Sequence, residues 1–358
     1  MNYGKRIRML TGIATLGAAL GAQAEFKVVG YLPQGRSLQG IQFSKVTHIN
    51  WSFAAPGNDG NLNGINGPQL TQLVTAAHAA KVKVFLALGG GGNHDNGFAV
   101  CTANETGRAT LVKSCMNAVH TYNLDGIDFD WEYPDGAQVA GFNATIKLVA
   151  AGLHAEGKQL SAAVTMNDWP RSFPTTELYD GLVPGFDFLN IMVYDNPPPH
   201  STIAHAQTGF DVWIKTKKLP KEKCVLGCPF YGPGGKYNQI VAANPAAAWV
   251  DRDGAEGYNS IPTMRKKAAM SAAQAGGIMF WELSQDATGD LSLLSAVHEV
   301  LLKSTAMGDL TISRASAHAG VPWRWNGRGG VSFGTTETGN QFGLRADAAG
   351  KWLPGPMP

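Results

Sequence analysis

The chain has 358 residues, of which 44% are hydrophobic and 16% are charged. This composition is typical of a globular protein, and the length suits one large domain. A formal net charge of +2 excludes the strongly basic footprint of a protein that binds nucleic acid or an anionic membrane through charge alone.

The first 24 residues have the pattern of a secretory signal peptide. Three basic residues between positions 5 and 8 precede an apolar run of small residues, and Ala22-Gln23-Ala24 fits a cleavage site. Removing this segment takes away those three positive charges and no acidic residue, so the net charge becomes −1. We therefore predict a secreted or periplasmic protein that begins near Glu25. No later apolar run reaches the ~18 residues of a membrane span, so we expect none.

Eight short apolar runs alternate with Ala-rich amphipathic segments, which is the pattern of βα units around a parallel sheet. The predicted strands are Lys27–Leu32, Thr47–Phe53, Lys83–Leu88, Gly126–Trp131, Gln159–Met166, Phe186–Tyr194, Cys224–Phe230 and Gly277–Trp281. Eight units favour an α/β protein with a closed (β/α)8 TIM barrel over residues 25–303, and a doubly wound sheet is the alternative. Active sites of such barrels lie at the carboxyl ends of the strands.

Residues 304–358 differ in composition from the barrel. They are rich in Gly and contain Trp323, Trp325 and Trp352, and the stretch Gly330–Gly343 predicts a hairpin. We expect a C-terminal tail or a small appendage. A sugar-binding role for its tryptophans and simple packing against the barrel are both open.

The cysteines and histidines predict no metal site. No Cys-x-x-Cys pair or zinc-like spacing occurs, and the nine histidines are scattered. Cys101 and Cys115 are close enough in sequence to form a disulfide in an oxidising compartment. Cys224 and Cys228 lie in one predicted strand, roughly 13 Å apart, which is too far for a bond.

Three carboxylates at alternate positions carry the chemistry that the sequence offers. Phe129 and Trp131 separate Asp128, Asp130 and Glu132, and a β-strand points alternate side chains to opposite faces. The three acids therefore share one face, and at least one of their pKa values should be raised, because like charges this close cannot all ionise easily. A carboxylic acid beside a carboxylate is what cleavage of a glycosidic bond needs. A calcium loop or a solvated acidic strand fits less well, because the intervening residues are bulky and apolar.

The same stretch carries a family resemblance. Asp125-x-x-Asp128-x-Asp130-x-Glu132, followed by Tyr133-Pro134, resembles the signature of glycoside hydrolase family 18, the chitinase family. Further segments resemble barrel strands of that family in the same order: Val29-Gly30-Tyr31, His48 to Ala54, Met192-Val193-Tyr194-Asp195 and Met279-Phe280-Trp281-Glu282. The resemblance covers roughly residues 26–303.

The resemblance implies a substrate-assisted reaction with retention and without a cofactor. Glu132 would act as general acid and base, and Asp130 would orient the acetamido group of the substrate. Tyr194 would donate a hydrogen bond to that group, and Asp128 would lie between Tyr31 and Asp130, able to share a proton with Asp130. The implied substrate contacts are Tyr31, Phe53, Gly90, Trp131, Met192, Asp195 and Trp281. Asp125 should face elsewhere and be structural.

Two segments depart from the family pattern. Ala87-Leu88-Gly89-Gly90 replaces the usual Ser-x-Gly-Gly, whose serine normally donates a hydrogen bond to the acid at the Asp128 position. We therefore expect a raised pKa for Asp128. Between Phe230 and Gly277 there is room for one helix, Thr263–Ala275, and a moderate loop, where many members carry a sizeable insertion. We expect a shallow, open cleft, which favours internal cleavage, with Trp169, Trp249 and Tyr231 as candidate stacking platforms.

Three functions are compatible with these residues. The first is a monomeric chitinase that acts on chitin or chito-oligosaccharides. The second is a chitin-binding lectin on the same barrel, although such members typically lack the acid at the Glu132 position. The third is an endo-N-acetylglucosaminidase that acts on other glycans.

Overall fold

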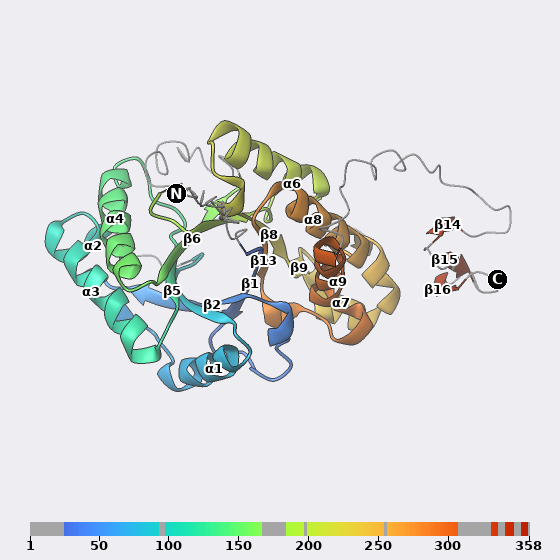
Figure 1. The fold of residues 1–358 in the computed structure, drawn as a ribbon, viewed down its shortest axis with the longest axis horizontal. Coiled ribbons are helices and arrows are strands. Elements are labelled where there is room, and N and C mark those ends of the chain that lie inside the picture. Colours follow the sequence, from blue (N-terminus) through green and yellow to red (C-terminus); the bar gives the residue numbers. More distant parts are fainter. Residues whose placement is uncertain are drawn as a thin grey trace, which may run out of the picture.

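The computed structural model describes residues 25–92, 97–166, 184–196, 199–253 and 256–306, together with three strands between residues 331 and 356. Eight parallel strands in this part of the chain form a closed barrel (Figure 1), in the spatial order β1-β2-β4-β5-β6-β7-β8-β13, with β13 pairing back to β1. They are β1 (Lys27–Pro33), β2 (His48–Pro56), β4 (Lys83–Gly89), β5 (Gly126–Asp130), β6 (Gln159–Thr165), β7 (Phe188–Met192), β8 (Cys224–Pro229) and β13 (Gly277–Trp281). The predicted (β/α)8 barrel is confirmed.

Each predicted strand has its counterpart, and the last one has the predicted bounds. Strand β2 runs three residues past its predicted end, to Pro56, and β7 is two residues shorter than predicted at each end, so that it ends at Met192 and not at Tyr194. Nearly every strand residue is buried, as in β5 and β7, because a parallel barrel covers both faces of its sheet.

The helices lie outside the barrel (Figure 1). In the described residues they are α1 (Gly67–Ala79), α2 (Phe98–Cys101), α3 (Glu105–Tyr122), α4 (Val139–Ala155), α6 (Ile203–Phe210), α7 (Tyr237–Ala243), α8 (Ile261–Gln274) and α9 (Leu293–Ala306), with a π-helical turn, Asp211–Thr216, after α6. Helix α4 shows why they pack there: its buried residues recur every three or four positions and form one apolar stripe. The last helix runs three residues past the predicted boundary at 303.

Two hydrophobic cores result from this arrangement. The larger one fills the space between the outer face of the sheet and the helices. The smaller one lies inside the barrel and includes Val29, Phe85 and Met279. Its partly buried upper members are all aromatic: Phe53, Tyr133, Tyr194 and Trp281. The carboxyl end of the barrel is therefore an aromatic rim above an apolar interior.

The amino end of the barrel is held by polar pairs between helices and strands. Asp125, just before β5, accepts hydrogen bonds from the Val84 backbone N–H at 2.8 Å and from His78 Nε2 of α1 at 2.8 Å. Asp187, before β7, repeats the arrangement with the Leu160 N–H and with His154 of α4. Asp125 is thus structural, as predicted, because it lies at the end of the strand opposite to Glu132.

The connection between β8 and β13 is more structured than predicted. It contains α8, close to the predicted Thr263–Ala275, and also α7, a 3-10 turn (Pro245–Trp249) and two hairpins, β9 (Tyr231–Gly232) with β10 (Gly235–Lys236) and β11 (Arg252–Asp253) with β12 (Glu256–Gly257). The other short elements of the barrel region are β3 (Leu62–Asn63) and the 3-10 turns Phe43–Lys45, Lys221–Lys223, Leu283–Gln285 and Gly289–Leu291. Short elements such as α7 carry too little periodicity to be predicted.

The C-terminal strands form their own antiparallel sheet. Strand β15 (Gln341–Ala346) pairs with β14 (Val331–Thr335), as the hairpin prediction requires, and with a third strand, β16 (Trp352–Pro356), that was not predicted. Trp323, Trp325 and the predicted signal peptide lie outside the described residues.

The four cysteines are buried thiols, so the Cys101–Cys115 disulfide that the sequence allowed is not formed in the structure. Cys224 and Cys228 are also unbonded, as predicted from their spacing along β8. Burial raises the pKa of Cys101 to about 11 and that of Cys115 to about 12, which keeps both protonated and unreactive.

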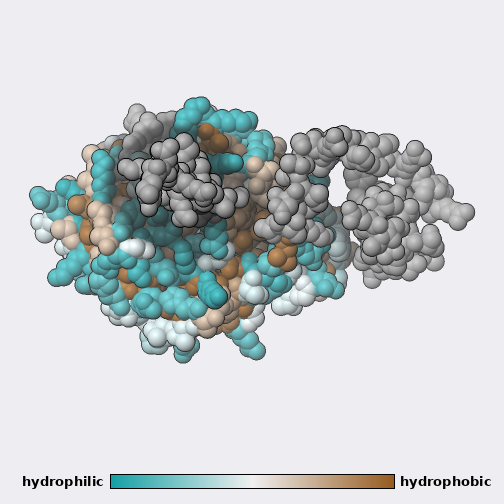
Figure 2. Space-filling model, viewed as in Figure 1, coloured by the Kyte–Doolittle hydropathy of each residue, from teal (hydrophilic) through white to brown (hydrophobic). Residues whose placement is uncertain are grey.

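Hydrophilic side chains cover much of the described surface on the face shown in Figure 2. The large apolar side chains that are exposed, Val100, Leu148, Val250 and Leu302, belong to different elements. Among the described helices, none is long and apolar enough to cross a membrane.

Candidate active site

Asp128 lies inside the barrel, where its side chain is fully buried. Its carboxylate accepts hydrogen bonds from three strands: from the Tyr31 hydroxyl at 2.6 Å, the Ser161 hydroxyl at 2.5 Å and the Asn190 amide at 3.2 Å. Burial raises the pKa of Asp128 to about 6, and these donors, with Asn50, hold it down from a still higher value. The predicted rise is confirmed, but its main cause is loss of water and not the neighbouring acids.

The hydroxyl that is missing at Ala87 is supplied from the other side of Asp128. Strand β5 lies between β4 and β6, and the register places Ala87 and Ser161 on either side of Asp128. Ser161 therefore gives Asp128 the hydrogen bond that a serine at position 87 would give. This replacement was not foreseen, because Ser161 follows Leu160 in an ordinary strand and only the register brings it to Asp128.

Asp130 follows Asp128 on the same face of β5 and is 3% exposed, while Glu132 lies just beyond the strand and is half-buried. Tyr194 lies close to both. Burial and then Tyr231 raise the pKa of the Tyr194 hydroxyl well above its usual value. The carboxylates of Asp130 and Glu132 raise it further. The structure thus brings together the four predicted catalytic residues, which come from β5 and from the residues that follow β5 and β7.

An aromatic floor lies beside this polar group. The ring of Trp281 stacks on Phe53 at 5.6 Å between centroids, and it meets Tyr31 at 5.6 Å in a tilted contact. Met192 packs with the same interior residues and is almost fully buried. A sugar ring offers apolar C–H faces, so a partly exposed indole such as Trp281 is a suitable surface to receive one.

The glycines after β4 allow backbones to approach closely. The Gly90 N–H donates to the Asp130 carbonyl at 2.7 Å, and a Cβ on Gly90 would lie 2.4 Å from the Phe53 ring. Gly90 also has φ of +89°, which side chains disfavour. Gly91 borders the Glu132 carboxylate, since a Cβ there would lie 3.6 Å from both of its oxygens.

Asp195 lies at the exposed edge of the site, where the Tyr231 hydroxyl donates to its Oδ1 at 2.5 Å. Tyr231 is thereby placed beside the site, and its role as a stacking platform stays a prediction. Trp249 instead packs, partly buried, against the outer core. Trp169 lies outside the described residues.

Trp131 is placed away from the carboxylates. It is 6% exposed and stacks on Phe98 at 5.0 Å in the outer core, with Phe142 against its edge. This follows from strand alternation, which puts Trp131 and Phe129 on the face opposite to the acids. The substrate contact expected of Trp131 does not fit this placement, because its ring faces the outer core and not the carboxylates.

Sequence reasoning did not assign a role to Tyr133, although it is part of the signature. Burial and then the carboxylate of Glu132 raise the pKa of its hydroxyl far above the usual value. Its place directly after Glu132, among the aromatic residues of the rim, could have indicated a site residue. Among the described residues, no group of three His, Cys, Asp or Glu side chains could hold a metal ion.

An aromatic rim around buried and half-buried carboxylates, at the carboxyl end of a (β/α)8 barrel, defines an enzyme-like site for a polar ligand with apolar faces. The family model "Glycosyl hydrolases family 18" matches residues 27–286. The chain therefore belongs to glycosyl hydrolase family 18, and the predicted resemblance is confirmed.

Similar proteins carry chitinase names. A probable endochitinase of Caenorhabditis elegans is 30% identical over 47% of this chain and 31% of its own length. A class V chitinase of Arabidopsis thaliana is 28% identical over 62% of this chain and 66% of its own length. The chain therefore spans less than two thirds of the length of these two relatives. The crystal structure of the chitinase ChiB from the chitin utilization locus of Flavobacterium johnsoniae matches with a TM-score of 0.70 and 29% identity, over 78% of this chain and 94% of that chain.

The raised pKa of Asp128 predicts a pH dependence of stability. Between its ordinary value of 3.8 and its folded value of about 6, the folded protein binds more protons than the unfolded chain. The contribution of Asp128 to the free energy of unfolding therefore falls as pH rises through this window, by roughly 3 kcal/mol, at 1.36 kcal/mol per pKa unit.

Urea unfolding of the wild type and Asp128→Asn between pH 4 and 7 measures this. The difference in unfolding free energy should shift in favour of the variant as pH rises. The buried Asp286, whose pKa is also raised to about 6, is present in both proteins and cancels. A difference that stays constant over this range would contradict the assignment.

Proposed function

We propose that this protein is a secreted chitinase, which hydrolyses β-1,4 linkages between N-acetylglucosamine units with retention. The single observation that carries the proposal is the joint position of Asp130, Glu132 and Tyr194 beside the partly exposed Trp281. Family membership and the chitinase names of the relatives support the same substrate class.

In the proposed reaction, Glu132 gives its proton to the glycosidic oxygen as that bond breaks. The carbonyl oxygen of the substrate's own acetamido group closes on the anomeric carbon, so no carboxylate of the enzyme attacks. Asp130 accepts the acetamido N–H and stabilises the positive charge that develops, while the Tyr194 hydroxyl donates to the carbonyl oxygen. Glu132 then removes a proton from water as the water oxygen attacks the anomeric carbon. The bond from the anomeric carbon to the acetamido oxygen breaks in this step, so the acetamido group is restored and the product keeps its anomeric configuration.

Asp128, which is buried inside the barrel next to Asp130, supports the proposed reaction. As a carboxylate it is stabilised by Tyr31 and Ser161, and it shares a proton with Asp130 when the charge on Asp130 must change. Asp195, fixed by Tyr231, is positioned at the rim for a hydroxyl of the distorted sugar. Trp281 forms the floor under the reacting ring.

We further propose that the enzyme acts as a monomer on internal bonds. In its described residues the β8–β13 connection adds to α8 only α7, the 3-10 turn Pro245–Trp249 and two short hairpins, whereas a large insertion would build a wall at the rim. A polymer can then enter from the side. The lectin alternative is weakened by the presence of Glu132, because lectin-like members typically lack the acid at this position.

Proton NMR of a chito-oligosaccharide pentamer during the first minutes of digestion tests the proposal. The wild type should release product first as the β-anomer, and Glu132→Gln should lower the rate by about 10²–10⁴-fold, because the general acid is lost. Glu105→Gln, which changes an exposed glutamate at the start of α3, is the matched control and should retain full activity.

Three other outcomes of this experiment would contradict the proposed reaction or its substrate. Binding without cleavage by the wild type would indicate the lectin, and early α-anomer would contradict the retaining reaction. Neither binding nor cleavage would point to a different N-acetylated glycan.

Ser161 offers a second prediction about the same reaction. Ser161→Ala removes the shortest hydrogen bond to Asp128, which raises the pKa of that carboxyl further and should lower kcat roughly tenfold near pH 6, with the acid limb moved to higher pH. Ala87→Ser in the same chain returns a hydroxyl from the opposite strand, so the double variant should recover most of kcat. Equal losses in the single and double variants would show that Ser161 does not act through Asp128.

A further inference from the structure

Tyr194 and Asp195 of the proposed site lie beyond the end of their strand. Strand β7 ends at Met192, so the ladder of strand hydrogen bonds does not hold Tyr194 or Asp195. Asp195 also has φ of +56°, a backbone conformation that needs support from its surroundings. The contacts of the following residues show where that support comes from.

Lys267 of α8 is fully buried, and its ammonium group contacts the end of this loop. It donates to the Ser201 carbonyl at 2.6 Å, to the Ser201 hydroxyl at 2.7 Å and to Asn259 Oδ1 at 2.6 Å. The Ser201 hydroxyl donates in turn to the Val193 carbonyl. One chain of hydrogen bonds therefore runs from Lys267 to the residue just before Tyr194.

A buried ammonium group is costly, and here it is not offset by an ion pair. Among the described residues no carboxylate lies within 4.0 Å of Lys267 Nζ, and burial lowers its pKa. All three of its protons instead meet neutral oxygens. An arrangement of this kind is favourable only while all three acceptors stay in place, so Lys267 restricts Ser201 to one position.

Asn259 also restricts the position of Ser201, because its amide donates to the Ser201 carbonyl at 3.0 Å. Ser201 has φ of +53° and is buried. At the other end of the loop the Tyr231 hydroxyl holds Asp195. Tyr231, Asn259 and Lys267 all belong to the connection between β8 and β13.

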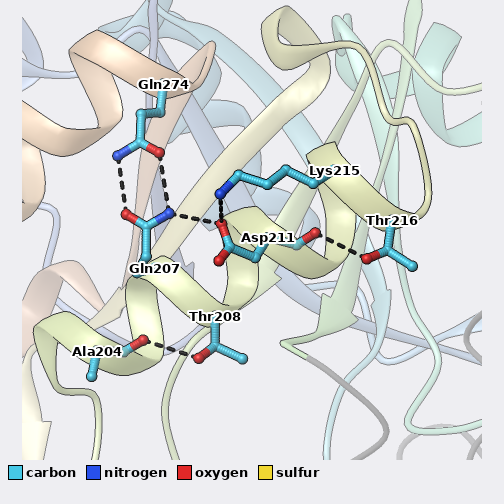
Figure 3. A network of polar contacts seen from close by, with 7 residues as sticks. All are labelled: Ala204, Gln207, Thr208, Asp211, Lys215, Thr216 and Gln274. Carbon is cyan, nitrogen blue, oxygen red and sulfur yellow. Dashed lines mark hydrogen bonds and ion pairs between the residues drawn. The ribbon is translucent and has the colours of Figure 1, made fainter.

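Helix α8 is itself fixed at both ends. At its start, Asp251 Oδ1 accepts from the Ser260 N–H at 3.0 Å, and the Ser260 hydroxyl caps the helix. At its end, Gln274 and Gln207 of α6 exchange two amide hydrogen bonds of 3.2 and 3.3 Å (Figure 3). Gln207 is further held by Asp211, which pairs with Lys215. Lys267 therefore projects from a helix that is anchored independently of the site.

We propose that Lys267 is a positioning residue, which holds Tyr194 and Asp195 in place through Ser201 and Val193. The link to catalysis rests on the proposed function, whereas the clamp itself does not. Since Tyr194 and Asp195 act on the reacting sugar, loosening the loop should lower kcat far more than it raises KM.

Lys267→Met tests the proposal, and Lys266→Met is the matched control, because Lys266 is the exposed neighbour on the same helix. Hydrogen exchange of peptides that span Val193–Ser201 is measured by mass spectrometry, with kcat and KM on a chito-oligosaccharide. Lys267→Met should speed exchange in this segment at least ~10-fold and lower kcat roughly 10²-fold, with KM nearly unchanged. Lys266→Met should match the wild type in both.

Should Lys267→Met fail to fold, Ser201→Ala, which cuts the link to Val193, carries the same expectation. Unchanged exchange would overturn the clamp, and faster exchange with wild-type kcat would overturn the positioning role. Faster exchange in a protein whose wild type does not cleave chito-oligosaccharides would support the clamp and refute the proposed function.

Discussion

Asp128 holds an ionisable carboxyl group in the middle of a barrel whose neighbouring interior side chains include Val29, Phe85 and Met279. Loss of water alone would make the carboxylate too costly there, and the cost is reduced by hydrogen-bond donors from several strands. Those donors are correctly placed only when the barrel is closed and in register. The chemistry of the site therefore depends on the same pairing of strands that closes the fold.

The rest of the site is built upward from this buried carboxyl. Asp130 follows it two residues later in β5, and Glu132 two residues further on, just beyond the strand, so the direction of β5 brings all three acids to the carboxyl end of the barrel. Trp281 and Phe53 come from the strands on either side of β1 and form the floor. Tyr194 and Asp195 are different, because they lie on a loop. Their positions depend on side chains of the β8–β13 connection, a segment that takes no other part in the proposed chemistry.

The barrel strands and the shared face of the three acids could be predicted from the sequence, because the apolar runs and the spacing of the acids are periodic. Continuous apolar runs predict buried parallel strands, and the spacing of the acids predicts their shared face. The role of Ser161 could not be predicted, because it depends on the register between β5 and β6. The role of Lys267 could not be predicted either, since a lysine in an amphipathic helix ordinarily faces water. For Trp131 the resemblance implied a substrate contact, although strand alternation alone predicts that this side chain faces the outer core.

In the proposed reaction the carboxylates act through the acetamido group of the substrate. Partially deacetylated chitosan tests it most directly, because each unit either has or lacks that group. We predict that mass spectrometry of the products finds N-acetylglucosamine at essentially every new reducing end. Glucosamine at new reducing ends in proportion to its content in the polymer would contradict substrate assistance, because cleavage would then proceed without the acetamido oxygen.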